Sequence, residues 1–331
     1  MKIHASAYST AIEIRRAGAA GENTLDTVLI TGGTEGLGKA AALLLAGEGF
    51  RVFATGRNTE RRAALEAAAR ESGLPIETLA MDVCDDESVD RAVSEIESRA
   101  GRVDAVVNNA GIAIVATMEE ISMEDLRRQF ETNYFGTVRV TQRVLPGMRE
   151  RRHGRIVNMS SVAGLLANPL FGPYSATKFA VEAFSDTLRL ELYPFGVYVS
   201  MLEPGYIPSG METASLGLSS RYTHGSIAGP YAQLYRNFLE NWKKVTRRAK
   251  LTPKDCARVV LRALRETPPK ARYPVTREAS VVRLMKRLLP DRMLDRMIIG
   301  MLQLDKIRPG SKIDPAAAKA ALEELTNRNR S

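Results

Sequence analysis

The chain has 331 residues, of which 44% are hydrophobic and 26% charged, and its net charge is +9. These proportions are typical of a globular protein with one large or two small domains, and they argue against a disordered chain. The two cysteines, Cys84 and Cys256, and the three histidines lack ligand spacing, so we expect neither a disulfide framework nor a metal site. No apolar run approaches the roughly 20 residues of a membrane-spanning helix. We therefore expect a cytoplasmic protein.

The first two thirds of the chain show an alternating pattern. We expect residues 1–24 to be a mobile N-terminal extension, because they lack the apolar block of a secretory signal. From Leu25 to about Val199, short runs rich in valine and isoleucine alternate with amphipathic stretches of helical length. This pattern predicts an α/β fold with a doubly wound, Rossmann-like parallel sheet and helices on both faces. The predicted strands are Thr27–Thr31, Arg51–Ala54, Ile76–Met81, Val103–Asn108, Arg155–Met159 and Val197–Leu202.

The alternation ends after Gly205. Residues 206 to about 251 contain several glycines and no strand pattern before a helical stretch, so we expect an extended lid over a substrate. The apolar side chains expected in the lid are Met211, Leu216, Leu218, Tyr222, Tyr231, Leu234, Tyr235, Phe238 and Trp242.

The C-terminal part is predicted to be mostly helical. A helix is expected to begin at Thr252-Pro253 and to run to about Arg265, followed by a last strand at Arg272–Val275. Residues 25–280 would form the Rossmann-like domain, and residues 281–331 a C-terminal extension. The helices expected in this extension are Val281–Leu289, Arg292–Leu302 and Pro315–Leu325.

The positive charge is concentrated in one region. Residues 243–292 hold 16 Lys/Arg and 4 Asp/Glu, a net +12, which leaves about −3 for the rest of the chain. This region is either a solvated face around the lid or a surface that attracts anionic lipid headgroups or an acidic substrate carrier. Basic residues alternate with Leu, Met and Ile in the C-terminal helices, as in helices that lie on a membrane surface, so peripheral membrane contact is one expectation. Nucleic-acid binding is not expected, because few aromatics interleave with the charges.

A glycine-rich turn follows the first predicted strand. In Thr31-Gly32-Gly33-Thr34-Glu35-Gly36-Leu37-Gly38, glycines at 32, 36 and 38 permit a tight turn and a close approach of the backbone to a pyrophosphate. The phosphates would rest on the N-terminus of the next helix, where free N–H groups and the helix dipole favour negative charge. The turn therefore predicts a dinucleotide site.

A tyrosine and a lysine lie one helical turn apart. Tyr174 and Lys178 stand at the start of an amphipathic run that ends near Leu192, which places both on one helix face. The pKa of a free tyrosine is about 10, and a nearby ammonium is expected to lower it. A tuned phenol can give a proton to a forming alkoxide or take one from an alcohol. Taken alone, such a pair is more often structural than catalytic.

Together these motifs resemble the short-chain dehydrogenase/reductase family over about Leu25 to Val275. Thr31 to Gly38 matches the family's TGxxxGxG loop, and Asp82-Val83 matches the aspartate after the third strand that contacts adenine. Asn108-Asn109-Ala110-Gly111 matches the family's NNAG, which supports the sheet and lies against the cofactor. The turn from Pro204-Gly205 to Ser209, which includes Ile207, matches the turn near the nicotinamide.

The resemblance also implies four catalytic residues. Asn133 fits the helix asparagine of the family's proton relay, which holds a water. Ser161, 13 residues before Tyr174, fits the serine that bonds the substrate oxygen. Tyr174 would move the proton, and Lys178 would bond the nicotinamide ribose and bias Tyr174. The tail around residues 286–292 is similar to the endings of members grouped with steroid and retinol dehydrogenases.

The choice of cofactor depends on the end of the second strand. NAD-preferring members of the family usually carry an acid there, whereas this chain has Gly56 and then Arg57, which would hold a 2′-phosphate. Glu35 opposes this expectation, because an acid at its position repels the phosphate. We expect NADP(H), with NAD(H) as the alternative. The cofactor-binding residues implied are Thr31, Gly32, Thr34, Glu35, Gly36, Leu37, Gly38, Arg57, Asp82, Val83, Asn109, Ala110, Gly111, Tyr174, Lys178, Pro204, Gly205, Ile207 and Ser209.

The function expected from this resemblance is an NADP(H)-dependent oxidoreductase. It would interconvert an alcohol and a ketone or aldehyde on a bulky lipophilic substrate such as a steroid, retinoid or terpenoid. The alternatives are a 3-oxoacyl-thioester reductase and a non-catalytic, NADP-binding regulatory protein. A homodimer or homotetramer is expected, because the helices that bear Asn133 and Tyr174 often form dimer faces in this family.

Overall fold

The apolar runs pair into one parallel sheet. The computed structural model describes residues 27–225 and 229–307, so the expected N-terminal extension and the helix at Pro315–Leu325 lie outside the described residues. The sheet order is β3-β2-β1-β4-β5-β6-β7, and every pairing is parallel, which confirms the doubly wound α/β fold. The strands are β1 (Thr27–Ile30), β2 (Arg51–Gly56), β3 (Ile76–Ala80), β4 (Ala105–Asn108), β5 (Gly154–Met159), β6 (Val197–Glu203) and β7 (Arg272–Pro274).

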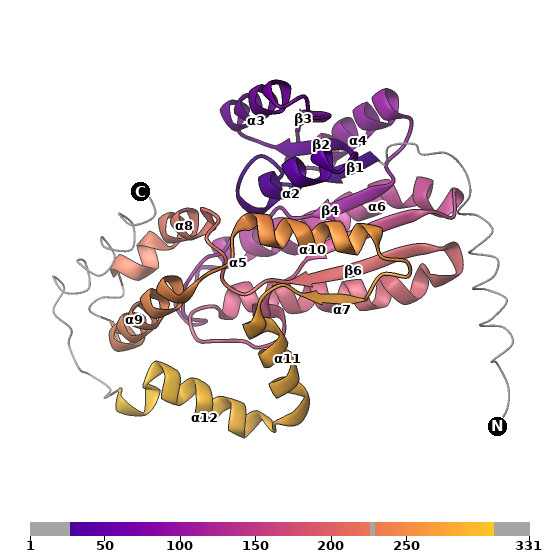
Figure 1. The fold of residues 1–331 in the computed structure, drawn as a ribbon. Coiled ribbons are helices and arrows are strands. Elements are labelled where there is room, and N and C mark those ends of the chain that lie inside the picture. The colour runs from indigo at the N-terminus through magenta and orange to yellow at the C-terminus, as the bar shows by residue number, and fades with distance from the viewer. Residues whose placement is uncertain (1–26, 226–228, 308–331) are drawn as a thin grey trace, which may run out of the picture.

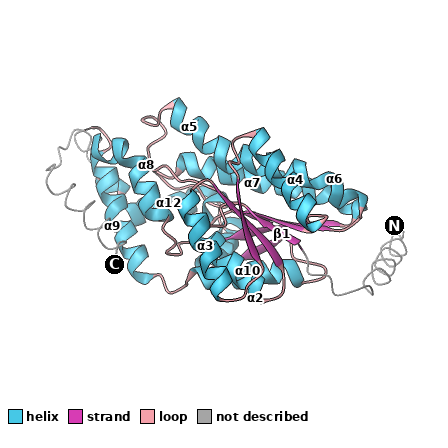
Figure 2. Cartoon of the chain, turned by 90° about the horizontal axis from the view of Figure 1, so that it is seen from above, coloured by secondary structure: helices cyan, strands magenta, loops and turns pink. Residues whose placement is uncertain are grey.

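Helices cover both faces of the sheet (Figure 2). The α-helices around the strands are α2 (Gly36–Gly47), α3 (Thr59–Glu71), α4 (Asp86–Ala100), α5 (Met123–Phe130), α6 (Gly136–Glu150), α7 (Gly172–Glu191) and α10 (Pro253–Arg265). Because successive side chains of a strand point to opposite faces, Val28 and Ile30 pack with α2 and α10, while Leu29 packs with α4 and α6. All four residues of β1 are buried, as in a sheet covered on both sides.

The segment after β6 is more helical than expected. Instead of a long loop before one helix, the chain forms α8 (Met211–Gly225) and α9 (Ala232–Arg248). A glycine in a helix interior lowers helix stability by about 1 kcal/mol relative to alanine, so Gly217 argued against a helix when only the sequence was considered. Tertiary hydrogen bonds hold α8 in place: Ser215 Oγ donates to Ala113 O at 2.6 Å, and Val115 N–H donates to Ser219 Oγ at 2.8 Å. These two serine hydroxyls form hydrogen bonds with backbone groups of the loop after β4, which pair with no strand. The bonds hold α8 against that loop.

The last two described α-helices follow β7: the first packs against β7, and the second turns back to contact α9 (Figure 1). They are α11 (Arg277–Leu288) and α12 (Asp291–Leu302). Because α11 begins at Arg277, a boundary between residues 280 and 281 falls inside a helix. Over residues 27–225 and 229–307, the structure contains no helix that is both long and apolar enough to cross a bilayer.

Candidate active site

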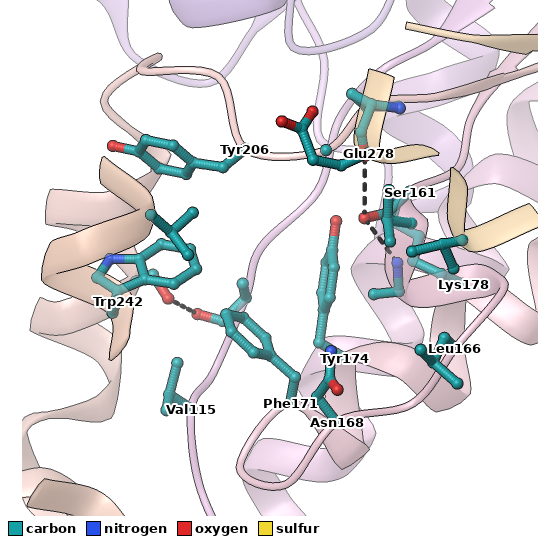
Figure 3. Close-up of a pocket in the computed structure, with 18 of the residues that line it drawn as sticks. Val115, Ser161, Leu166, Asn168, Phe171, Tyr174, Lys178, Tyr206, Trp242 and Glu278 are labelled. Carbon is teal, nitrogen blue, oxygen red and sulfur yellow. Dashed lines mark hydrogen bonds between the residues drawn. The ribbon is translucent and has the colours of Figure 1, made fainter. Parts of the chain in front are cut away.

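A cavity of about 550 Å³ lies at the carboxyl ends of β4, β5 and β6, where open α/β sheets bind their ligands. Figure 3 shows the Tyr174 ring standing in this cavity, with Ser161 and Lys178 on one side and Phe171 and Trp242 on the other. The sheet therefore brings three of the four predicted catalytic residues to one end of one cavity.

Helix α7 positions Tyr174 and Lys178. The helix has Pro173 in its first turn, and Tyr174 and Lys178 follow on one face, as predicted. Lys178 is buried, and its Nζ donates a 2.7 Å hydrogen bond to the carbonyl of Met159 at the end of β5. The same nitrogen lies 5.6 Å from the centre of the Tyr174 ring. This contact fixes the height of α7 against the sheet.

The pKa values of the pair differ from the sequence expectation. Burial raises the pKa of Tyr174 to about 12, and a hydrogen bond with Ser161 opposes the rise. Burial lowers the pKa of Lys178 to about 8, against the opposing charge of Glu182. We expected the ammonium to lower the pKa of Tyr174, but removal of the phenol from water has the larger effect. Tyr174 therefore keeps its proton at neutral pH and is suited to donate it.

Ser161 follows β5 and caps a short 3₁₀ turn at Val162–Gly164. Its Oγ accepts the Ala163 N–H at 3.1 Å and lies 3.5 Å from the Pro204 carbonyl oxygen, to which it donates. The turn thus holds the hydroxyl at the cavity surface, beside the loop that follows β6.

Asn133 lies in a π-helical turn, Glu131–Phe135, between α5 and α6. Its Oδ1 accepts the Ile112 N–H at 2.8 Å, and its Nδ2 donates to Ile112 O at 2.9 Å and to Thr177 Oγ1 at 3.0 Å. The side chain therefore joins the loop after β4 to α7 and is not among the described residues that line the cavity. Its place in a proton relay stays a prediction.

The glycine turn fits a dinucleotide phosphate. Glu35, at the N-cap of α2, makes no side-chain cap and the first turn has no acid, so the first N–H groups of α2 remain available to an anion. Gly36 has a φ of +53°, and a Cβ there would come within 2.6 Å of the Ser209 carbonyl oxygen. A Cβ on Gly38 would come within 2.2 Å of the Gly32 carbonyl oxygen. Only glycine permits these approaches.

Several predicted cofactor residues hold this turn in place through hydrogen bonds with the loop after β4. Thr31 Oγ1 accepts the N–H groups of Asn109 and Ala110, each at 3.0 Å, and Asn109 Nδ2 donates to the carbonyls of Thr31 and Gly32. Thr34 is buried where the turn meets β2. The cofactor residues that also line the cavity are Leu37, Asn109, Gly111, Tyr174, Lys178, Pro204, Gly205, Ile207 and Ser209.

The other predicted cofactor residues lie farther out, past the ends of β2 and β3. Arg57 is two-thirds exposed and pairs with Asp82 at 3.5 Å, while Val83 is buried against α6. Glu35, which we expected to repel a phosphate, pairs with Arg61 of α3 at 2.5 Å. Arg61 is a second cation at this site that sequence reasoning missed. Its position, four residues after Arg57, was the available signal.

The rest of the cavity wall is mostly apolar. Of the expected lid residues, Met211, Leu216, Phe238 and Trp242 line the cavity. Leu218, Tyr222, Tyr231, Leu234 and Tyr235 belong instead to the packed cluster beneath α8 and α9. Sequence reasoning missed the wall residues of the C-terminal helices, whose apolar spacing was the available signal: Val282, Met285, Leu294, Met297, Ile298, Met301 and Leu302.

Glu212 and Tyr206 are polar residues of the wall that interact with each other. Glu212 is buried, and its carboxylate accepts the Ser209 N–H at 3.0 Å, which ties α8 to the predicted nicotinamide loop. Burial, together with Glu212, raises the pKa of Tyr206. Within the described ranges, no three His, Cys, Asp or Glu side chains group as metal ligands would.

Comparison with known proteins matches this arrangement. The family model described as short chain dehydrogenase matches residues 26–216. Human retinol dehydrogenase 8 is 35% identical over 260 residues, covering 77% of this chain and 81% of that protein. The NADPH-dependent 3-dehydrocapnine reductase of Ornithobacterium rhinotracheale is 32% identical over 81% of this chain and 94% of its own length.

A solved structure agrees. A short-chain dehydrogenase from Streptomyces avermitilis has a TM-score of 0.66 at 28% identity, over 86% of this chain and 97% of that one. A family model that spans more than half of the chain, relatives above 30% identity and a common fold lead to one conclusion. The chain belongs to the short-chain dehydrogenase/reductase family, is related to its steroid and retinol dehydrogenases, and is an oxidoreductase that acts on alcohol and carbonyl groups.

Proposed function

We propose that the protein is an NADP(H)-dependent oxidoreductase that interconverts a bulky lipophilic alcohol and its ketone or aldehyde. The observation that carries this proposal is the division of the cavity, which has Tyr174, Ser161 and Lys178 at one end and apolar side chains over most of its remaining wall. Its volume of about 550 Å³ suits a ligand larger than a short alcohol. Two relatives are named for retinol and for 3-dehydrocapnine, which supports the same class.

The protein's own residues supply position and a proton. Ser161 Oγ donates a hydrogen bond to the substrate oxygen, and the protonated Tyr174 gives up its proton as charge develops on that oxygen. Lys178 compensates the phenolate that remains, and Asn133 keeps the loop after β4 against α7. The bound nicotinamide supplies the hydride.

Tyr174→Phe is expected to lower kcat by at least about 100-fold, because it removes the proton donor but keeps the ring. The measurement is NADPH-dependent reduction over a panel of steroid, retinoid, terpenoid and 3-oxoacyl-thioester carbonyls, with NADPH binding followed by fluorescence. Binding should be retained, and the exposed Tyr193→Phe should behave as wild type. Turnover of 3-oxoacyl thioesters alone would favour the thioester reductase, and NADPH binding without any turnover a regulatory protein.

The proposed preference for NADP(H) rests on two arginines past the end of β2. Arg57 follows β2, and Arg61 lies beside Glu35 and neutralises it. A 2′-phosphate would meet two guanidinium groups there, and the two nearby acids, Asp82 and Glu35, are each paired with one of them. The pairing of Glu35 removes the objection raised by the sequence.

The double variant Arg57→Ala/Arg61→Ala is expected to lower kcat/KM for NADPH about 100-fold, since each charge-assisted hydrogen bond to the phosphate is lost. The value for NADH should change little. Arg70→Ala, at the far end of α3, is the matched control. A wild-type enzyme with a higher kcat/KM for NADH than for NADPH would contradict the assignment.

We also propose that residues 281–307 extend a catalytic domain at residues 25–280, and that this cytoplasmic protein touches anionic membranes through α11 and α12. The outer faces of these helices expose Val281, Leu284 and Leu288 to 53–66%. Arg287 of α11 and Arg292 and Arg296 of α12 are also exposed, and none of the three pairs with an acid within the described chain. Exposed apolar and cationic side chains on two consecutive helices suit a lipid surface.

Flotation with phosphatidylserine vesicles tests this contact. Wild-type protein should float at low salt, and Arg287→Glu/Arg292→Glu/Arg296→Glu should stay below, because charge reversal repels the anionic surface. Arg62→Glu/Arg70→Glu/Arg91→Glu changes the net charge equally on other helices and should float. Equal behaviour of both triple variants would refute the specific surface.

A homodimer or homotetramer is also proposed, with an interface on the helices that bear Asn133 and Tyr174. Phe135, just before α6, and Phe179, on α7, are 48% and 42% exposed, so they offer apolar surface that a second subunit could cover. Light scattering should give a dimer or tetramer, and Phe135→Ser/Phe179→Ser should lower the measured mass. A monomeric wild-type protein would exclude the assembly.

A further inference from the structure

A line of charged residues continues from the catalytic pair along α7. Tyr174, Lys178, Glu182 and Asp186 follow one another at intervals of four residues and so share a helix face. Glu182 is buried, and its carboxylate accepts a 3.0 Å bond from Nε of Arg272 on β7. Asp186 pairs with the same guanidinium. The mechanism above uses only the first two members of this line.

The same arginine, Arg272, also lies near a buried acid on β6. Glu203, the last residue of β6, is 0% exposed and directly precedes the Pro204-Gly205 loop. Its Oε1 lies 3.5 Å from Arg272 Nε and accepts a 2.8 Å bond from Arg283 of α11, while its Oε2 has no partner. Burial of an unpaired carboxylate destabilises a protein, so loss of Arg283 would leave the charge of Glu203 poorly compensated.

We propose that Arg283 is a positioning residue: its ion pair with Glu203 holds α11 over the substrate cavity, and a proton on Glu203 loosens that hold. The role of the cavity as the substrate site rests on the proposed function, whereas the hold itself does not.

Helix α11 is fixed at few points. At its start, Thr276 caps the helix by accepting the Ala279 N–H at 3.2 Å, and a Cβ on Gly205 would lie 2.6 Å from the Thr276 hydroxyl. At the far end of α12, Asn237 Nδ2 donates to Leu302 O at 2.8 Å. Between these ends, Arg283 is the described α11 side chain that forms an ion pair with the sheet.

The ion pair between Arg283 and Glu203 affects the cavity wall because α11 forms part of that wall. Glu278, Val282 and Met285 line the cavity from α11, on either side of Arg283 in the sequence. Figure 3 shows Glu278 at the edge of the cavity, beyond the Tyr174 hydroxyl. Movement of α11 therefore opens the wall without moving Tyr174, whose helix is fixed through Lys178.

The groups around Glu203 make its protonation relevant near neutral pH. Burial, with the charges of Glu182 and Asp186, raises the pKa of Glu203 to about 7, against the opposing charges of Arg283 and Arg272. Above this pH the carboxylate and Arg283 form a charge-assisted bond. Below it the neutral acid offers a weaker acceptor, so the hold on α11 weakens as pH falls.

Trp242 reports the state of the wall. It is the only tryptophan in the sequence, and it lines the cavity together with α11. Acrylamide quenching of its fluorescence in the full-length protein is expected to rise about twofold as pH falls through about 7. Arg283→Met and Glu203→Gln should both show the higher quenching at every pH, without this transition. Arg283→Lys should restore part of it, and Lys286→Met, on the same helix but paired with Asp291, should match wild type.

Wild-type quenching and pH dependence in Arg283→Met would overturn the proposal, and so would a transition that survives in Glu203→Gln. Circular dichroism establishes that each variant is folded. Because quenching needs no turnover, this failure would leave the proposed function standing. Conversely, a wild-type protein that reduces no carbonyl would sink the proposed function and leave the quenching result intact.

A kinetic measurement then connects the hold to the substrate. In NADPH-dependent reduction, Arg283→Met is expected to raise KM for decanal about tenfold with kcat nearly unchanged. KM for propanal, whose short chain offers little surface for contact with Val282 and Met285, should stay near the wild-type value. An equal change for both aldehydes would refute the role of Arg283 in substrate positioning.

Discussion

Lys178 is a buried cation, and the site depends on how its charge is accommodated. Its ammonium is satisfied by the Met159 carbonyl at 2.7 Å, so α7 must cross the end of β5 at one height. Tyr174, one turn earlier, then enters the cavity beside Ser161, and Glu182, one turn later, reaches Arg272. A shift of α7 by a single residue would leave the lysine unpaired and turn the tyrosine out of the cavity.

The cavity combines two environments that suit a hydride and proton exchange. Its reactive end has few polar groups, each held by the backbone or by a neighbouring side chain, as Ser161 is held by Ala163. The remaining wall is mostly apolar and offers little competing polarity near the place where charge develops, which strengthens the field of those groups. The raised pKa of Tyr174 and the lowered pKa of Lys178 follow from this same dryness.

The sheet and the placement of Tyr174 and Lys178 on one helix face were predictable because their signals are local. Apolar runs of strand length, glycines in a turn and an interval of four residues are all visible in the sequence. The helix α8 was not, because hydroxyl contacts with the backbone near Val115 outweigh the cost of Gly217. The pairing of Glu35 with Arg61 was not predictable either, and neither was the burial that raises the pKa of Tyr174 where we expected it to be lowered. Such effects arise from residues distant in sequence or from the loss of water.

The cavity wall is built from two parts of the chain, one inside and one after the segment that matches the family model. The proposed catalytic residues all fall within residues 26–216, the part that matches the family model, whereas Phe238, Trp242 and the residues from α11 and α12 come after it. Under the proposed function, the reacting groups and a large part of the substrate wall therefore come from separate stretches of sequence. Mutation can reshape the later stretch while the earlier one keeps its chemistry, so a lineage can acquire a new substrate without rebuilding the centre that transforms it.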